Sequence, residues 1–201
     1  QSPFSFISDQ FFERAKTVFG WANRGGGKTL CVAILNVVES LFKPGIEITC
    51  AGAIEQQANK GYEYVTKMMF SEPLLLRTLV SSLRSSTEFF NGSAIKITTG
   101  TYHGLNSPHS TRMRVDEIEL MHPTLLQEAL QISIGTPDGK WRAGDCLTST
   151  RKFTNGTVQK LLDDKKNSVK VYSWCIKDTL QRCTRLCKDD PVYGNCPAYS
   201  R

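Results

Sequence analysis

A run of three glycines between two apolar segments constrains this chain more than any other feature; it lies in WANRGGGKTL, residues 21–30. Residues 17–21 (TVFGW) are β-branched and aromatic, which predicts a short buried strand before the glycines. Residues 28–42 (KTLCVAILNVVESLF) are apolar nearly all round and stop before residues 43–45 (KPG), which predicts a buried helix. A strand, a glycine loop with Lys-Thr and a helix, in this order, are typical of a phosphate-binding loop.

The loop has the chemistry to bind the phosphates of ATP, because glycines let backbone N–H groups close around phosphate oxygens. Lys28 is expected to reach the β- and γ-phosphates, and Thr29 to hold Mg²⁺ through its hydroxyl group. The usual pattern, G-x-x-x-x-G-K-[ST], has Gly at the position of Ala22, a change that Ala tolerates where φ stays negative. The alternative is a glycine-rich turn before an ordinary helix. The predicted ATP-binding residues of the loop are Gly25, Gly26, Gly27, Lys28, Thr29 and Leu30.

A second strand end with an acid for the metal is expected beside such a loop, and residues 115–119 (VDEIE) supply one. Asp116 is predicted to hold Mg²⁺, and Glu117 to orient and deprotonate the attacking water. The alternative is a solvated acidic turn, since Arg112 and Arg114 interrupt the apolar strand that should precede the acid.

Hydroxyl groups follow a further predicted strand, residues 146–150 (CLTST), which ends in Thr148, Ser149 and Thr150. The carboxyl edge of a parallel sheet is where a bound phosphate lies, although these residues alone favour a Ser/Thr-rich turn. An ATPase also needs an Arg to neutralise charge on the γ-phosphate. The candidates are Arg24, Arg84, Arg112, Arg114 and Arg151.

Further elements alternate along the chain. Strands are predicted at residues 46–51, at 113–115 and in a hairpin over 88–99, and helices at residues 54–70, 74–83, 123–134 and 156–162. Strands alternating with helices predict an α/β fold with a mainly parallel sheet.

The composition is that of an ordinary globular chain, with 22% charged residues and a net charge of +6, a mild basic bias compatible with a polyanionic partner. The sequence contains no run of ~18 apolar residues, so no membrane span is predicted. The chain has seven Cys and no secretory signal, which favours reduced thiols in a cytosolic setting. It begins with Gln, which is expected of an excised fragment. A zinc site is weighed against reduced thiols for four residues, Cys175, Cys183, Cys187 and Cys196.

The order of these motifs resembles the large terminase subunits, the ATPases that pump DNA into the capsids of tailed phages and herpesviruses. The similar segments are ANRGGGKT, ITCAGAIEQQA, NGSAIKITTGTYHGLNSPHSTRMRVDEIELM and LTSTRKFTNGTVQKLLD, and they span residues 10–163. The resemblance implies a P-loop ATPase of the additional-strand, catalytic-glutamate class, with helices on both faces of the sheet. It divides the chain into a P-loop ATPase core at residues 1–156 and a small, truncated lid at residues 157–201.

Residue roles follow from the same resemblance. Lys28, Arg24 and Glu117 would be catalytic, and Gln10 would contact adenine. Thr148, Ser149 and Thr150 match the coupling motif, which senses the γ-phosphate and transmits hydrolysis to the lid. Asn106 stands about where many family members have their arginine finger, so that role stays open among the other arginines, acting in the same or a neighbouring subunit.

The resemblance also implies partners: double-stranded DNA, the portal protein and the small terminase subunit. The chain would be a monomer alone and a ring on the portal, in the cytoplasm of the infected cell, docked on the procapsid. The nuclease of the family is not expected here, because no convincing carboxylate cluster is present. Two rivals remain, a helicase-like DNA-dependent ATPase and a non-catalytic module that binds phosphate or DNA.

Overall fold

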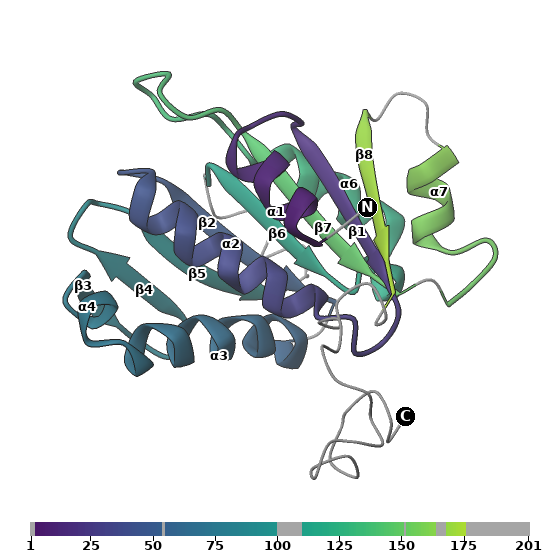
Figure 1. Ribbon diagram of the computed structural model, residues 1–201. Helices are drawn as coiled ribbons and strands as arrows, with labels where there is room; N and C mark the ends of the chain where they lie inside the picture. The colour runs from purple at the N-terminus through teal and green to yellow at the C-terminus, as the bar shows by residue number, and fades with distance from the viewer. Residues whose placement is uncertain (1–2, 54, 100–109, 151, 164–167, 176–201) are drawn as a thin grey trace, which may run out of the picture.

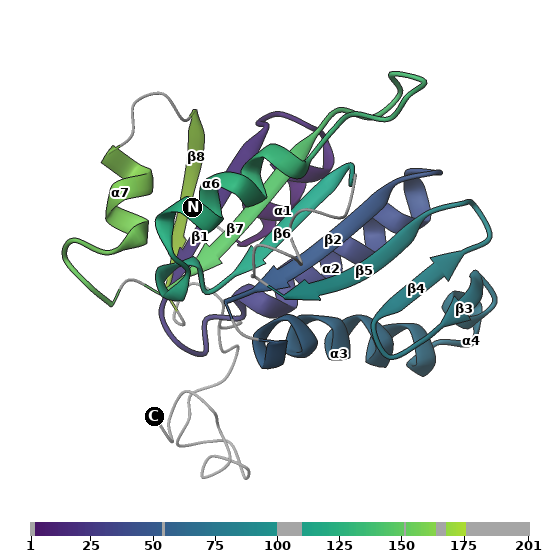
Figure 2. The ribbon, with the colours of Figure 1, turned by 180° about the vertical axis from the view of Figure 1, so that it is seen from behind.

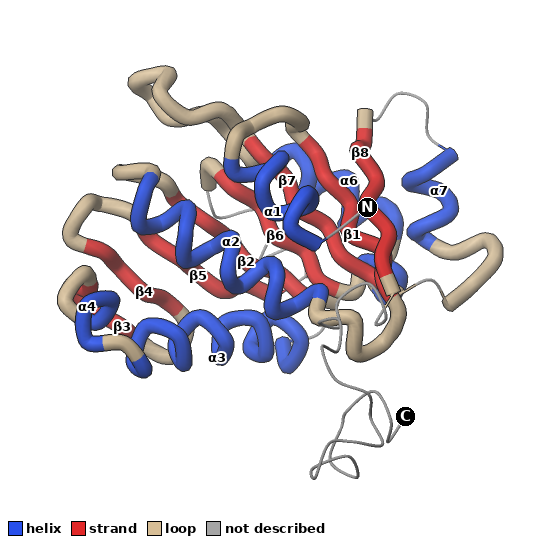
Figure 3. Tube along the Cα trace, viewed as in Figure 1, coloured by secondary structure: helices blue, strands red, loops and turns tan. Residues whose placement is uncertain are grey.

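A computed structural model describes residues 3–53, 55–99, 110–150, 152–163 and 168–175. One sheet lies between two layers of helices, as Figure 3 shows by colour. The strands are β1 (Thr17–Ala22), β2 (Glu47–Gly52), β3 (Leu79–Ser82), β4 (Ser86–Phe89), β5 (Ala94–Thr99), β6 (Arg112–Asp116), β7 (Gly144–Ser149) and β8 (Val169–Trp174). The helices are α1 (Pro3–Phe11), α2 (Lys28–Phe42), α3 (Glu55–Ser71), α4 (Pro73–Leu76), the 3-10 turn η1 (Ile118–Leu120), α6 (Pro123–Ile132) and α7 (Thr157–Asp163).

The strand order is β3-β4-β5-β2-β6-β7-β1-β8. In this order, the six strands β5, β2, β6, β7, β1 and β8 are parallel to their neighbours. Strands β3 and β4 add an antiparallel hairpin at the β5 edge. Strand β7 lies between β1, which precedes the glycine loop, and β6, which ends in Asp116. This is the inserted strand of the additional-strand class, and the predicted fold class is confirmed.

Helices cover both faces of the sheet. Helices α1, α2 and α3 lie on the face toward the viewer in Figure 1, and α6 and α7 lie on the other face in Figure 2. Alternation along β6 explains how one strand serves both layers: Met113 and Val115 pack in the cluster with α6, whereas Arg112 and Arg114 point toward α2. Because β1, β7 and β6 are parallel neighbours, their carboxyl ends lie at one edge of the sheet.

The two arginines of β6 belong to a buried ion-pair network centred on Glu39 of α2. Arg112 Nε lies 2.9 Å from Glu39 Oε1, Lys43 Nζ lies 3.0 Å from the same oxygen, and Arg114 pairs with Oε2. Arg112 also pairs with Glu13 at 2.5 Å. Glu39 and both arginines are fully buried. The arginines do not interrupt the strand, because their charges are neutralised under α2.

Three elements differ from the sequence predictions. The helix predicted at residues 74–83 is wrong: α4 is one short turn, and residues 79–82 form β3, which pairs with β4. Pro73 and the Glu72 side chain begin the turn, but pairing with β4 takes the following residues into the sheet. Helix α1 and strand β8 were not predicted, because neither segment has a periodicity that stands out from its surroundings.

The described residues after 157 pack against the rest of the fold. Val158 and Leu161 of α7 pack in the cluster with α6, and β8 pairs with β1 in the sheet. The indole Nε1 of Trp174 donates a hydrogen bond of 2.7 Å to the carbonyl of Gly26 in the glycine loop. The domain boundary at 156/157 stays a prediction; residues 176–201 lie outside the described residues.

Within the described residues, no helix combines the length and apolar character that a membrane crossing requires.

Candidate nucleotide-binding site

The glycine loop, residues 23–27, joins β1 to α2 in a shape that requires its glycines. Gly25 and Gly27 have φ of 80° and 75°, in the left-handed region that favours glycine. A Cβ at Gly26 would lie 3.0 Å from the Ala22 Cβ, so the loop closes tightly over the end of β1. Ala22 itself is a buried β1 residue without positive φ, as expected of the departure from the usual motif.

Lys28 is the first residue of α2, and its side chain points back over the loop. Its Nζ donates to the carbonyls of Ala22 at 3.1 Å and Asn23 at 3.2 Å. Burial lowers the pKa of Lys28, and the charges of Glu117 and Asp116 act in the opposite direction. An anionic phosphate beside Nζ would replace carbonyl acceptors with charged ones and favour the ammonium form.

Asp116 joins two other residues singled out by sequence, Thr29 and Thr148. Thr29 Oγ1 donates to Asp116 Oδ2 at 2.8 Å, and Thr148 Oγ1 donates to Oδ1 at 2.6 Å. These groups fit Mg²⁺, because this ion takes oxygen ligands and is usually held by one or two protein groups together with phosphates and waters. The hydroxyl of Thr29 and the carboxylate of Asp116 are the groups that would hold it.

Glu117 occupies a strained backbone conformation, with φ 54° and ψ 48°, which is uncommon for a residue other than glycine. Its N–H donates to Asp116 Oδ1 at 2.9 Å. Its carboxylate accepts a hydrogen bond from Thr150 Oγ1 at 3.1 Å and lies 3.7 Å from Lys152 Nζ. The backbone and the side chain of Glu117 are therefore both fixed by neighbours at the carboxyl edge.

The three residues of the predicted coupling motif contact different partners. Thr148 contacts Asp116 and Thr150 contacts Glu117, whereas Ser149 Oγ accepts from the N–H of Glu119 at 3.2 Å. The two threonines therefore contact the two acids, and the serine contacts the turn that follows them.

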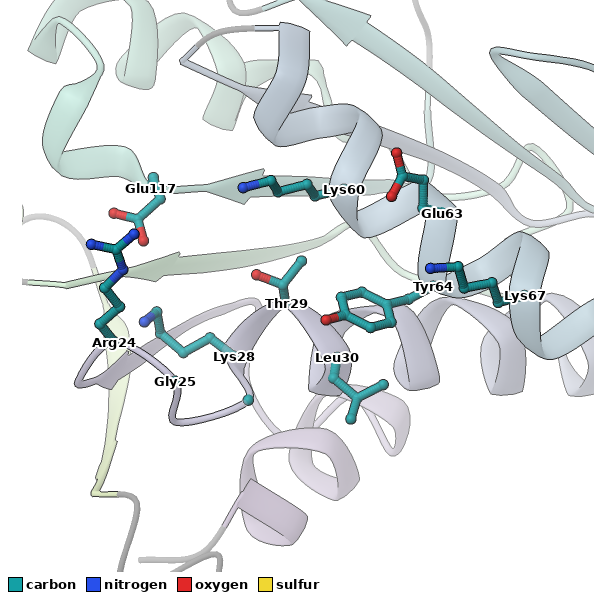
Figure 4. A pocket seen from close by; sticks show the side chains of 11 residues that line it. Arg24, Gly25, Lys28, Thr29, Leu30, Lys60, Glu63, Tyr64, Lys67 and Glu117 are labelled. Carbon is teal, nitrogen blue, oxygen red and sulfur yellow. The ribbon is translucent and has the colours of Figure 1, made fainter. Parts of the chain in front are cut away.

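A cleft of ≈ 500 Å³ lies over the loop, and Figure 4 shows its side chains. The loop, the first turn of α2 and the residue after β6 supply Arg24, Gly25, Gly27, Lys28, Thr29, Leu30 and Glu117. Helix α3 supplies Lys60, Glu63, Tyr64 and Lys67, which the sequence predictions missed. Their spacing places them on one helical face, which is the signal that was available.

The arginine-finger candidates separate clearly. Arg112 and Arg114 are wrong, because both are fully buried in the Glu39 network on the α2 face. Arg84 is exposed in the turn between β3 and β4 and does not line the cleft; a role toward a neighbouring subunit stays a prediction. Arg151 and Asn106 lie outside the described residues. Arg24 lines the cleft, and Figure 4 shows its guanidinium on the same side as Glu117.

The predicted contact of Gln10 with adenine is not supported by its position. Gln10 is buried in α1 and lines a second hollow with Arg112, Arg142 and Gly144. A Cβ at Gly144 would lie 2.5 Å from Gln10 Nε2, so Gln10 lies at the amino end of β7. The carboxyl end of β7, which carries Thr148, is about 13 Å further along the strand at ~3.3 Å per residue. Gln10 lies at the edge of the sheet opposite the glycine loop.

The zinc prediction is not tested. Cys175 is exposed, and its three predicted partners, Cys183, Cys187 and Cys196, lie outside the described residues.

No protein-family model and no curated protein matches this sequence. Among solved structures, the large terminase of a thermophilic bacteriophage aligns with a TM-score of 0.71 at 13% identity, over 95% of this chain and 50% of that one. The same terminase in complex with ATP-gamma-S aligns with a TM-score of 0.68 at 13% identity, over 95% and 50% of the two chains. The ATPase domain of the Thermus phage P74-26 large terminase aligns with a TM-score of 0.63 at 14% identity, over 85% and 83%.

This chain spans about half the length of the first of these large terminases, 50% of it, and most of the separate P74-26 ATPase domain, 83%. The loop, the acid-bearing strand and the strand between them therefore belong to a known arrangement: the chain has the P-loop fold of phage large terminase ATPase domains.

Proposed function

We propose that this chain binds and hydrolyses Mg²⁺-ATP, and that hydrolysis drives double-stranded DNA into a viral capsid as part of a packaging motor. The observation that carries the proposal is the hydrogen-bonded set Thr29–Asp116–Thr148 at the glycine loop, with Glu117 beside it. The likeness in fold to large terminase ATPase domains supports the coupling to DNA. The portal protein and the small terminase subunit are the partners that this function requires.

Each residue has a part in hydrolysis. The N–H groups of the loop bind the phosphates, and Lys28 neutralises charge on the β- and γ-phosphates. Thr29 and Asp116 would hold Mg²⁺, which would supply further neutralisation of phosphate charge. Glu117 orients a water molecule and accepts its proton. Arg24 lies in the same cleft and stabilises charge that develops on the γ-phosphate.

The cleft also has a place for the nucleobase. Leu30 and Tyr64 are 40% and 42% exposed and line the cleft together, Leu30 directly after Thr29 of the loop. Figure 4 shows both side chains on the side of the cleft away from Arg24 and Glu117. A flat apolar ring between two apolar side chains buries surface on both sides, so this slot accepts a base while the loop holds the phosphates.

Replacing Tyr64 by Ala is expected to weaken ATP binding roughly 5- to 150-fold, because base stacking on an aromatic ring contributes about 1–3 kcal/mol. Inorganic tripolyphosphate has no base, and its affinity should stay within about twofold. Titration calorimetry with both ligands measures the difference, and Tyr64→Phe is the matched control that keeps the ring. Equal losses for ATP and tripolyphosphate would place Tyr64 beside the phosphates and contradict the slot.

The proposed function is tested in a packaging assay with purified capsids, in which the full-length parent protein is compared with its Lys28→Ala form. Loss of ATP-dependent DNA uptake is expected, since Lys28 is the cation of the phosphate loop. DNA uptake at an unchanged rate would contradict the proposed motor function.

Two further assays separate the rivals. A helicase-like enzyme would separate the strands of forked DNA. A non-catalytic module would bind ATP but release no phosphate, even with DNA and the assembly partners present.

A further inference from the structure

Glu119 is a buried carboxylate that the proposed reaction does not use. It lies in η1, two residues after Glu117, and is 5% exposed. Its Oε1 accepts from the N–H groups of Lys152 at 3.2 Å and Phe153 at 2.9 Å, and its Oε2 accepts from Val158 at 2.8 Å. One side chain thus satisfies three backbone donors, two in the segment that follows β7 and one in the first turn of α7.

The segment closes around this carboxylate. A Cβ on Gly156 would lie 2.4 Å from Glu119 Oε1, 2.6 Å from Cδ and 2.7 Å from Oε2, so only glycine fits there without a shift. Thr157 Oγ1 donates to the carbonyl of Met121 at 2.7 Å, and the Glu119 N–H donates to Ser149 Oγ. The turn after Glu117 and the segment after β7 are therefore held together at both ends.

The same two segments carry the groups that contact Glu117. Thr150 and Lys152, which contact the Glu117 carboxylate, lie on the strand end and segment that Glu119 holds. The Glu117 carbonyl accepts from the N–H of Leu120 at 3.0 Å, so η1 also holds the strained backbone of Glu117. A shift of the segment against η1 changes the place of Glu117 relative to both neighbours.

We propose that Glu119 is a positioning residue that, with Gly156, holds the segment after β7 in the register that orients Glu117, and that joins movement of Glu117 to α7. This inference rests on the proposed ATPase function. Charge-assisted hydrogen bonds to backbone N–H groups are short and directional, which suits a link that must not slip. Misplacement of a catalytic group by about 1 Å costs on the order of 10²-fold in rate.

Glu119→Gln tests the role, because the amide keeps the shape but loses the charge and one acceptor oxygen. We expect kcat for ATP to fall by about 10- to 100-fold while Kd for ATP stays within about twofold. Ser133→Ala is the matched control: it removes a buried hydrogen bond of 2.6 Å to Asp145 at the opposite end of β7, and kcat should not change. A purely structural role predicts that kcat falls only with the folded fraction, measured by thermal unfolding, and that result overturns the proposal.

Gly156→Ala should reproduce the loss of kcat by pushing the carboxylate away. Glu119→Asp shortens the side chain by one methylene and makes room for the added Cβ, so the double variant should recover activity relative to Gly156→Ala alone. A double variant with an additive loss contradicts the contact as the cause.

Amide hydrogen exchange gives a readout that does not depend on turnover. A non-hydrolysable ATP analogue should alter exchange at Phe153 and Val158 in the wild type and not in Glu119→Gln. If the wild type binds ATP without hydrolysing it, the proposed function fails while the exchange result still decides the link. If the wild type hydrolyses ATP and the variants keep its kcat, the link alone fails.

Discussion

Replacing Glu117 by Gln is expected to lower ATP turnover by about 10²- to 10⁴-fold while Kd for ATP stays within about twofold. The amide has nearly the shape of the carboxylate and can still accept a hydrogen bond from Thr150, but it cannot take a proton from water. The phosphate contacts proposed for Lys28 and Thr29 do not involve Glu117, so binding should survive. Single-turnover hydrolysis and an ATP titration measure the two quantities separately.

Glu88→Gln is the matched control for charge, because this exposed carboxylate of β4 lies outside the cleft. Its turnover should equal that of the wild type. Turnover by Glu117→Gln at the wild-type rate would show that another group activates the water, and the assignment of Glu117 would be wrong.

Replacing Glu39 by Ala is expected to lower the free energy of unfolding by about 3–5 kcal/mol, because it removes the carboxylate that pairs with buried Arg114 and leaves Glu13 to pair with both Arg112 and Lys43. Arg112, Arg114 and Lys43 all pair with this one carboxylate. Urea unfolding at pH 7 measures the loss. The control is Glu47→Ala, whose ion pair with Lys96 at 3.5 Å is exposed and should contribute no more than about 1 kcal/mol.

The same network predicts a dependence on pH. Burial by itself would raise the pKa of Glu39, but Arg114, Arg112 and Lys43 outweigh it and hold the pKa below its usual value. A group whose pKa is lower in the folded chain stabilises it fully above the unfolded value, about 4.3 for Glu, and less as pH falls toward the folded value. The stability gap between wild type and Glu39→Ala should therefore narrow below about pH 4. A gap that stays constant on acidification contradicts the assigned charge state.

The local chemistry of the site was readable from the sequence, because Lys28 and Thr29 are adjacent residues and so are Asp116 and Glu117. What was not readable depends on contacts between distant segments. Tyr64 and Lys60 reach the cleft only because α3 packs beside α2, and Gln10 moves to the far edge because α1 packs at the amino end of β7.

The partner of Arg112 and Arg114 also could not be predicted from the sequence. Two cationic residues in a strand predict either an exposed strand face or a ligand-binding site. Only the packing of α2 on β6 shows that Glu39 is their partner. The strand β8 was missed because its membership of the sheet is decided by pairing with β1, more than a hundred residues earlier in the chain.

The hydrogen bond from the Trp174 indole to the Gly26 carbonyl gives the glycine loop an optical reporter of its own. Indole emission responds to the hydrogen bonding of its N–H group, and this N–H is bonded to the loop that we propose binds phosphate. A rearrangement of the loop on nucleotide binding would therefore change the surroundings of the Trp174 indole. The intrinsic fluorescence of Trp174 would then report binding without an added label.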